Sequence, residues 1–198
     1  MKAPEYWNHN TAYYRWIAER ISDCGSVLDV GCGDGALAAA LDDGTRAIVG
    51  IDPDERCVRE ARRKHPSPRM AFERCSFEDF AADRSFAAVL FIASLHHMEM
   101  APALIKAKEL LSPGGKLLVV GLAKPSTVPD YVVELLRVIP SRAVSALKRM
   151  RTSEELGIPA SYEFPEMNAV RSAAKELLPG ARLRYGLHYR YLLEWVKK

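Results

Sequence analysis

The sequence predicts one α/β domain with a mostly parallel sheet, helices on both faces and an antiparallel hairpin at its C-terminal end. Short β-branched runs alternate with stretches of helical periodicity, which is typical of parallel β/α units. A length of 198 residues suits a single hydrophobic core and is short for two domains. The last segment, residues 181–196, reads as strand throughout, with Gly186 at a turn that would join two antiparallel strands.

The elements follow one another closely up to Gly121. Proline ends the second helix at Pro66 and Pro68, because it lacks a backbone donor and restricts the residue before it. The turn sequence at 112–115 is expected to end the third helix. The predicted strands are Ser26–Val30, Ala47–Ile51, Met70–Arg74, Phe86–Ile92 and Lys116–Gly121. The predicted helices are Ala36–Leu41, Asp54–Lys64 and a third that carries Leu104, Ala107 and Leu111 at helical spacing.

The pattern changes after Gly121. A helical apolar stripe runs from Val128 to Ile139, and Pro140 is expected to break it. A further helix is predicted over 165–178, closed by a Pro-Gly pair. We expect residues 1–22 to form an N-terminal lid and helix, and residues 122–162 to form an insertion that faces the substrate.

Composition excludes several classes of protein. A content of 48% hydrophobic and 27% charged residues is that of a globular chain and not of a disordered or fibrous one. No apolar run approaches the roughly 20 residues of a membrane helix, and the N-terminus has no apolar signal stretch, so we expect a cytoplasmic protein. The four cysteines form no CxxC pair, which argues against a disulfide framework and a zinc site.

The most informative string is VLDVGCGDG at residues 27–35. A strand runs directly into Gly31, Gly33 and Gly35, and glycine lets the backbone turn sharply and approach a ligand. The spacing is GxGxG, which differs from the GxGxxG of dinucleotide sites, and no Gly-Lys-Ser/Thr follows as in a P-loop. Asp29 stands just before the loop, where a carboxylate can accept from an ammonium group or order a water.

A second acidic position lies at the end of the next strand, at Asp52. A carboxylate at that place can bind both hydroxyls of a ribose. Together the loop and Asp52 point to an adenosine-containing ligand without a diphosphate.

With these motifs the sequence resembles the class I S-adenosylmethionine-dependent methyltransferases. VLDVGCGDG is similar to their first motif, IVGIDPD at 48–54 to their acidic second-strand motif, and LSPGGKLLVV at 111–120 to their fifth strand and its turn. The string VLFIASLHHM at 89–98 resembles their fourth strand and the loop beside the transferred methyl group. The resemblance implies a Rossmann-like, seven-stranded fold, S-adenosylmethionine as cofactor and S-adenosylhomocysteine as product.

The resemblance also implies roles for single residues. Asp29 and the loop that contains Gly31, Cys32, Gly33 and Gly35 would hold the methionyl part of the cofactor, Asp52 the ribose, and Pro53 the adenine. Ser76 stands where the family usually has an aspartate for the adenine amino group, so that contact would fall to the Phe77 amide or to Glu78. The implied cofactor-binding set is Asp29, Gly31, Cys32, Gly33, Gly35, Asp52, Pro53, Ser76, Phe77, Glu78, Ile92 and Ala93.

Candidates for chemistry are fewer. His97 or His96 could act as a general base or contact the acceptor, because the pKa of histidine lies near neutrality; alternatively, both are packing residues of a loop. The two histidines have no group of acidic residues near them in the sequence, so we expect no metal site. An aromatic N-terminal cluster would either close over the site or anchor the first helix, and its members are Tyr6, Trp7, His9, Tyr13 and Tyr14.

We therefore expect a methyltransferase that acts on an oxygen or nitrogen atom of a small molecule. The stretch 137–151 holds five basic residues and no acidic one, so an alternative is an RNA or protein substrate, or a carrier protein, docked on that face. A third possibility is a non-catalytic subunit that binds S-adenosylmethionine. The identity of the acceptor and the oligomeric state stay open at this point.

Overall fold

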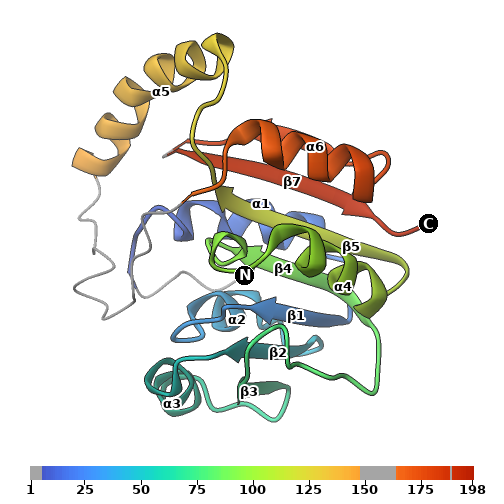
Figure 1. Cartoon of the computed structure of the whole chain (residues 1–198). Helices are drawn as coiled ribbons and strands as arrows, with labels where there is room; N and C mark the ends of the chain where they lie inside the picture. The colour runs from blue at the N-terminus through green and yellow to red at the C-terminus, as the bar shows by residue number, and fades with distance from the viewer. Residues whose placement is uncertain (1–5, 148–163, 188) are drawn as a thin grey trace.

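The computed structural model describes the backbone of residues 6–147, 164–187 and 189–198, and the side chains of these residues except 138–147. Within this part, seven strands form one sheet in the order β3-β2-β1-β4-β5-β7-β6 (Figure 1). Strands β1 to β5 are parallel, and β7 pairs antiparallel with both β5 and β6. The expected mostly parallel, seven-stranded sheet with a C-terminal antiparallel hairpin is confirmed.

The elements follow the chain in a regular order. The strands are β1 (Ser26–Val30), β2 (Ala47–Asp52), β3 (Met70–Arg74), β4 (Phe86–Ile92), β5 (Leu111–Leu122), β6 (Arg182–Tyr185) and β7 (Arg190–Val196). The helices are α1 (Tyr14–Arg20), α2 (Ala36–Leu41), α3 (Glu55–Lys64), α4 (Met100–Leu110), α5 (Val128–Leu147) and α6 (Met167–Leu177), with 3-10 turns η1 (Thr11–Tyr13) and η2 (Leu95–His97).

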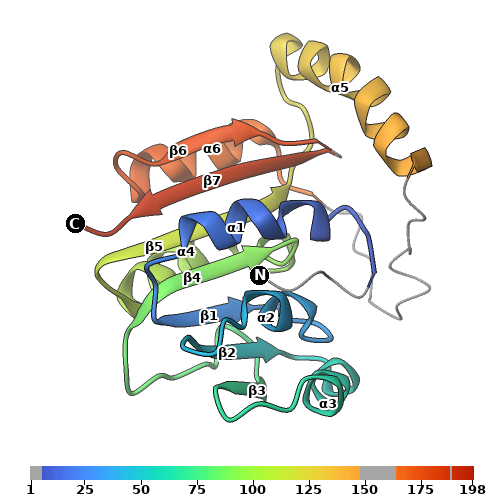
Figure 2. The same ribbon diagram turned by 180° about the vertical axis from the view of Figure 1, so that it is seen from behind.

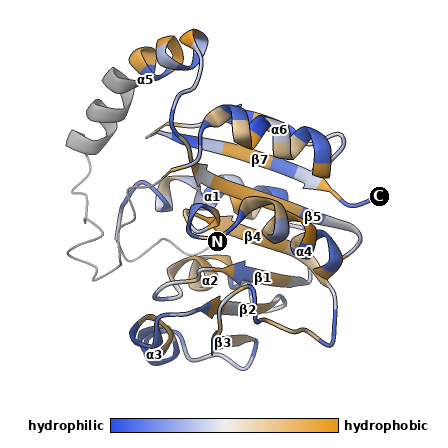
Figure 3. Cartoon of the chain, in the orientation of Figure 1, coloured by the Kyte–Doolittle hydropathy of each residue, from blue (hydrophilic) through white to orange (hydrophobic). Residues whose placement is uncertain are grey.

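The sheet is covered on both faces, and each face has its own apolar core. Helices α4 and α6 lie on one face (Figure 1), and α1 and α2 lie on the other (Figure 2). Neighbouring residues of one strand enter opposite cores, as Leu28 and Val27 of β1 do. Strand β4, at the centre of the sheet, is therefore apolar along its whole length (Figure 3), which is typical of a parallel strand buried on both sides.

Strand β5 begins five residues before the sequence predicts. Leu111 already pairs with Phe86 of β4, and the ladder then shifts register before Ala88 pairs with Lys116. The hydroxyl of Ser112 donates to the Phe86 carbonyl at 3.0 Å. The turn residues 112–115 are thus held within an irregular strand, because side-chain and terminal backbone groups replace the missing ladder bonds.

Helix α5 is the element that sequence reasoning described wrongly. It continues through Pro140 to Leu147 and extends away from the sheet (Figures 1 and 2). Proline removes one i→i−4 hydrogen bond, and a helix of 20 residues can continue past one missing bond.

The first half of α5 is polar toward the domain and apolar toward solvent. Its start is held by Asp130, which is fully buried and forms an ion pair with Arg171 of α6. The outer side chains, which are half or more exposed, are Val128, Tyr131, Val132, Leu135 and Leu136. Contacts of polar groups, and not apolar burial, therefore fasten this half of the helix.

Candidate active site

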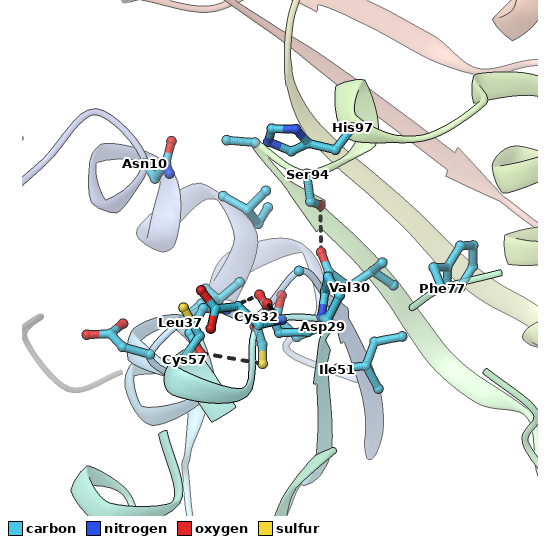
Figure 4. A pocket seen from close by; sticks show the side chains of 18 of the residues that line it. Asn10, Asp29, Val30, Cys32, Leu37, Ile51, Cys57, Phe77, Ser94 and His97 are labelled. Carbon is cyan, nitrogen blue, oxygen red and sulfur yellow. Dashed lines mark hydrogen bonds between the residues drawn. The ribbon is translucent and has the colours of Figure 1, made fainter. Parts of the chain in front are cut away.

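One large cavity opens at the carboxyl ends of the parallel strands. It has a volume of about 480 Å³ and lies where β1 and β4 are neighbours while their following helices cover opposite faces of the sheet. In open α/β sheets this switch point is where ligands bind. Figure 4 shows the cavity with Asp29, Val30 and Cys32 from β1 and its loop, Ile51 from β2, and Ser94 and His97 beyond β4.

The glycine loop has the backbone that its sequence requires. Gly31, Gly33 and Gly35 have φ values of +75°, +55° and +78°, in the left-handed region that favours glycine. Around Gly33 no protein atom lies within 4 Å of the position that a Cβ would take, and Gly33 lines the cavity. The loop therefore leaves room for a ligand to approach its backbone.

Asp29 is a buried carboxyl group at the floor of the cavity. Its side chain is 2% exposed, and its Oδ2 atom has no hydrogen-bond partner among the described residues. Burial, and then the charge of Asp52, raises the pKa of Asp29 to about 7. A buried polar atom without a partner is costly, so Asp29 is suited to accept from a bound ligand.

Asp52 organises the loop from the end of β2. Its Oδ2 accepts from the Gly33 amide at 3.0 Å, and its Oδ1 accepts from the Asp54 amide at 2.9 Å. Each carboxylate oxygen has a second lone pair, so both remain able to accept from a hydroxyl group.

The loop after β3 forms the side wall. Phe77 is buried and packs edge-on against Phe91, with the ring centres 5.2 Å apart. The hydroxyl of Ser76 donates to Asp79 at 2.7 Å and accepts from the Asp79 amide at 3.1 Å. The Ser76 hydroxyl is therefore engaged within its own turn.

The segment after β4 forms the opposite wall and is strained. Ala93 has a φ of +55°, which is uncommon for a residue with a Cβ, and its amide donates to the Val120 carbonyl at 2.7 Å. Ser94 and the exposed His97 follow, and both line the cavity. Left-handed backbone at a non-glycine residue persists where its surroundings hold it, often at functional sites.

His96 lies outside the cavity lining. Its ring packs on His97, with the ring centres 4.0 Å apart, and meets Phe164 edge-on at 5.1 Å. Burial, and then the neighbouring His97 and Arg190, lowers the pKa of His96 to about 4. His96 is therefore neutral at pH 7 and is a poor general base.

The N-terminal segment contributes to the cavity wall. The Tyr6 hydroxyl donates to Asp34 of the glycine loop at 3.2 Å, and Asp34 also accepts from Lys64 of α3 at 3.1 Å. Tyr6 and Tyr14 line the cavity. Trp7 and His9 contact each other edge-on outside the lining, and the Tyr13 hydroxyl donates to the Leu187 carbonyl.

Most of the residues singled out from the sequence meet in this one cavity. Of the implied cofactor-binding set only Gly35 is missing from the lining, because it begins α2 behind the loop. Sequence reasoning gave no role to several other lining residues. Asn8, Asn10, Leu37 and Cys57 lie outside the quoted motif strings, and Asp34, Ser94 and Met98 lie within them.

Comparisons with known proteins agree with this geometry. A family model described as a methyltransferase domain matches residues 27–115. An uncharacterized methyltransferase of Mycobacterium tuberculosis is 30% identical over 194 residues, which cover 96% of each chain. This chain belongs to the class I S-adenosylmethionine-dependent methyltransferases.

Other members of the family are similar over different extents. The ubiquinone biosynthesis O-methyltransferase of Xanthomonas axonopodis pv. citri is 33% identical over 114 residues, 54% of this chain and 48% of that protein. The crystal structure of the N-methyltransferase NodS from Bradyrhizobium japonicum with S-adenosylhomocysteine aligns with a TM-score of 0.64 and 15% identity, over 96% of this chain and 88% of that one.

The cofactor of this methyltransferase is S-adenosylmethionine, and the residues present fit it. The unpartnered Oδ2 of Asp29 can accept from an ammonium group, the left-handed loop presents backbone to the methionyl chain, and Asp52 keeps acceptors for a ribose. When bound, the cofactor supplies an activated sulfonium methyl group.

The described residues contain neither a membrane-spanning helix nor a metal-binding cluster. No helix there has both the length and the apolarity needed to cross a bilayer. No group of three or more His, Cys, Asp or Glu side chains in the same part of the chain could hold a metal ion.

Proposed function

We propose that this methyltransferase transfers the methyl group to an oxygen or nitrogen atom of a small molecule. The observation that carries the proposal is that one cavity contains both the cofactor-type residues and a second end without them. Asp29 and Asp52 mark the first end, and Asn10 and His97 mark the second. An acceptor held at the second end would share an enclosed, partly apolar space with the methyl group.

The roles of the site residues are part of the same proposal. The glycine loop and Asp29 hold the methionyl part, Asp52 holds the ribose, and Pro53, Phe77 and Glu78 hold the adenine. Ile92 and Ala93 border the methyl group. Alignment of the acceptor atom with the sulfur–methyl bond provides most of the catalysis, because that methyl group is already activated.

His97 is the proposed base for an acceptor that must lose a proton. It lines the cavity from the strained segment after β4, whereas His96 lies behind it. In this proposal His96 has only an indirect role, because it packs against His97 and does not line the cavity.

Confinement of the site favours a small acceptor. The segment Tyr6–Tyr14 contributes side chains to the cavity lining and is tied to the glycine loop by the hydrogen bond from Tyr6 to Asp34. We propose that residues 1–22 act as the lid and that the insertion 122–162 faces the substrate. None of the described residues 122–147 lines the cavity, and residues 1–5 and 148–163 lie outside the described part of the chain.

A macromolecular acceptor docked on the basic stretch is the alternative. Of its five basic residues, the structure describes the side chain of Arg137, which donates to the Gly186 carbonyl at 2.7 Å and stacks over the Tyr185 ring. Arg137 therefore fastens α5 to the hairpin, and Arg142, Lys148, Arg149 and Arg151 lie outside the described side chains.

The first test uses labelled cofactor. Incubation with [methyl-14C]S-adenosylmethionine and a fractionated extract of the source cells should place the label in the small-molecule fraction. Label that stays with RNA or protein would contradict the proposal, and binding without any transfer would favour the non-catalytic alternative.

A second test addresses the ribose contact of Asp52. Asp52→Ala should weaken S-adenosylhomocysteine binding by about tenfold or more in calorimetry, because charged hydrogen bonds are lost. Unchanged affinity would refute the ribose role.

A further inference from the structure

The acceptor end of the cavity contains a polarised amide, Asn10. Its Oδ1 accepts from both Nε and Nη2 of Arg190, the first at 3.1 Å. Arg190 has only donors, so the oxygen of Asn10 must face it. The Asn10 Nδ2 group then faces away from Arg190, and it donates to none of the described residues.

Arg190 is a buried cation built into the sheet. It is 8% exposed and stands at the start of β7, paired with Leu122 at the carboxyl end of β5. Burial lowers the pKa of its guanidinium group to about 10, so it remains charged at neutral pH. A cation at Oδ1 draws electron density from the amide and makes the Nδ2 hydrogens stronger donors.

Acidic groups are unevenly distributed around the cavity. The acidic lining residues all come from the β1–β3 side of the sheet, and they are Asp29, Asp34, Asp52, Asp54 and Glu78. Among the described residues, the N-terminal segment that contains Asn10 and the segment after β4 that contains His97 contribute no carboxylate to the lining; Figure 4 labels both side chains. A protonated amine would find no counter-charge at this end, whereas an anion would find the field of Arg190.

We propose that Asn10 is an acceptor-binding residue that selects a negatively charged oxygen, a carboxylate or a phenolate, and that Arg190 is its positioning residue. This inference rests on the proposed function and narrows its oxygen-or-nitrogen acceptor to an ionised oxygen. The amide of Asn10 donates to the acceptor group and holds it toward the methyl group.

The reaction balances without a base. The acceptor oxygen gives an electron pair to the methyl carbon, the carbon–sulfur bond breaks, and its pair stays on sulfur. An anion and a sulfonium cation become a neutral ester or ether and a neutral thioether, and no proton moves. For such an acceptor His97 needs only to contact the substrate.

The test combines product chemistry with one isosteric variant. Native enzyme and [methyl-14C]S-adenosylmethionine label the small molecules of a deproteinised extract, and hot hydriodic acid then cleaves methyl from oxygen but not from nitrogen. We expect volatile labelled methyl iodide. Prior alkaline hydrolysis releases methanol from an ester and not from an ether, which separates a carboxylate source from a phenolate source.

Asn10→Asp tests the residue itself. The new carboxylate still accepts from Arg190, so the structural contact is kept, but the donor is replaced by a negative charge. We expect KM for the labelled acceptor fraction to rise about tenfold or more, with the Kd of S-adenosylhomocysteine changed less than about twofold. Asn168→Asp is the matched control, because Asn168 Oδ1 likewise accepts from an arginine, Arg171, at 2.8 Å, outside the cavity.

Three results would overturn the inference. Label that resists hydriodic acid would show a nitrogen acceptor and leave the proposed function standing. Unchanged acceptor KM in Asn10→Asp, or an equal loss of S-adenosylhomocysteine affinity, would remove Asn10 from the acceptor site. No label in any small molecule would refute the proposed function and this inference together.

Discussion

Gly31 and Ser94 approach so closely that a Cβ atom on Gly31 would stand 2.5 Å from the Cβ of Ser94. Ser94 also donates its hydroxyl to the Val30 carbonyl at 2.5 Å. The carboxyl ends of β1 and β4 are thus joined directly at the cavity floor. The first glycine of the loop is required for contact with a neighbouring strand as well as for its φ of +75°.

A double-mutant cycle on this pair should show strong coupling. Gly31→Ala should lower the free energy of unfolding by about 2–4 kcal/mol, from left-handed backbone and overpacking together. In a Ser94→Gly background the overpacking is relieved, so the same alanine should cost about 1–2 kcal/mol. Urea unfolding of the four proteins measures the cycle, and additive effects would show that the two residues do not press on each other.

Gly33→Ala separates ligand room from backbone strain. Gly180 is a matched control, since it has a φ of +84° and, like Gly33, no protein atom within 4 Å of the place where a Cβ would stand, but it lies outside the cavity. Both alanine variants should lose about 1–2 kcal/mol of stability. Only Gly33→Ala should lose S-adenosylhomocysteine affinity in calorimetry, by about tenfold. Equal affinities in the two variants would mean that the ligand does not approach the loop at Gly33.

Local signals account for what the sequence could predict. The strands from Ser26 to Ile92 are short and bounded by turn residues, β1, β2 and β4 are mainly apolar, and the GxGxG spacing lies where a strand meets a helix. For these elements the local conformational preference agrees with the burial in the folded domain, so the sequence alone was sufficient to predict them. The same holds for the cavity residues that belong to a motif, such as Asp29 and Asp52.

The remaining features depend on contacts between distant segments. Asn10 and Arg190 are 180 positions apart, and nothing in the sequence links the two residues, so only the fold brings them together. Pro140 signals a helix end locally, yet α5 continues through it. The strand start at Leu111 depends on pairing with Phe86, which no local pattern around Ser112 reveals.

The buried Asp29 should make stability depend on pH. Its pKa is raised to about 7, so the folded state holds this proton more tightly than the unfolded state does. The contribution of this proton to the free energy of unfolding is fully present below the ordinary pKa of a carboxyl group. It is lost as the pH rises from about 4 to about 7, by up to about 4 kcal/mol. Asp29→Asn lacks the titration, so the variant should match the native protein near pH 4 and exceed it in stability at pH 8.

Urea unfolding of both proteins across this range measures the difference. If Asp29 has its proposed role, Asp29→Asn should also bind S-adenosylhomocysteine more weakly at pH 8, because a neutral amide would replace the carboxylate proposed to accept from the ligand's ammonium group. A stability difference that stays constant with pH would contradict the buried titration of Asp29.

The contacts of Asp130 should govern stability and leave cofactor binding alone. Its Oδ2 accepts from the Ser126 and Thr127 amides at 2.9 Å each, and its Oδ1 accepts from Tyr185 and Arg171. These donors hold the pKa of Asp130 well below its usual range. In Asp130→Asn the NH2 group of the amide must face hydrogen-bond donors. We therefore expect the free energy of unfolding to fall by about 2–3 kcal/mol, which is less than for a fully buried ion pair because Arg171 is partly exposed.

Ser126→Ala is the graded comparison for this cluster. It removes only the hydroxyl that donates to Asp130 Oδ2 at 3.1 Å and accepts from the Asn168 amide at 2.9 Å, so its loss should be smaller, about 1 kcal/mol. Neither Asp130 nor Ser126 lines the large cavity, so the Kd of S-adenosylhomocysteine should be unchanged in both variants under conditions where they are folded. Thermal unfolding with and without S-adenosylhomocysteine distinguishes the effects: a parallel drop in Tm is expected. A smaller ligand-induced rise in Tm for Asp130→Asn would instead link the start of α5 to the cofactor site, because ligand stabilisation depends on Kd alone at fixed ligand concentration.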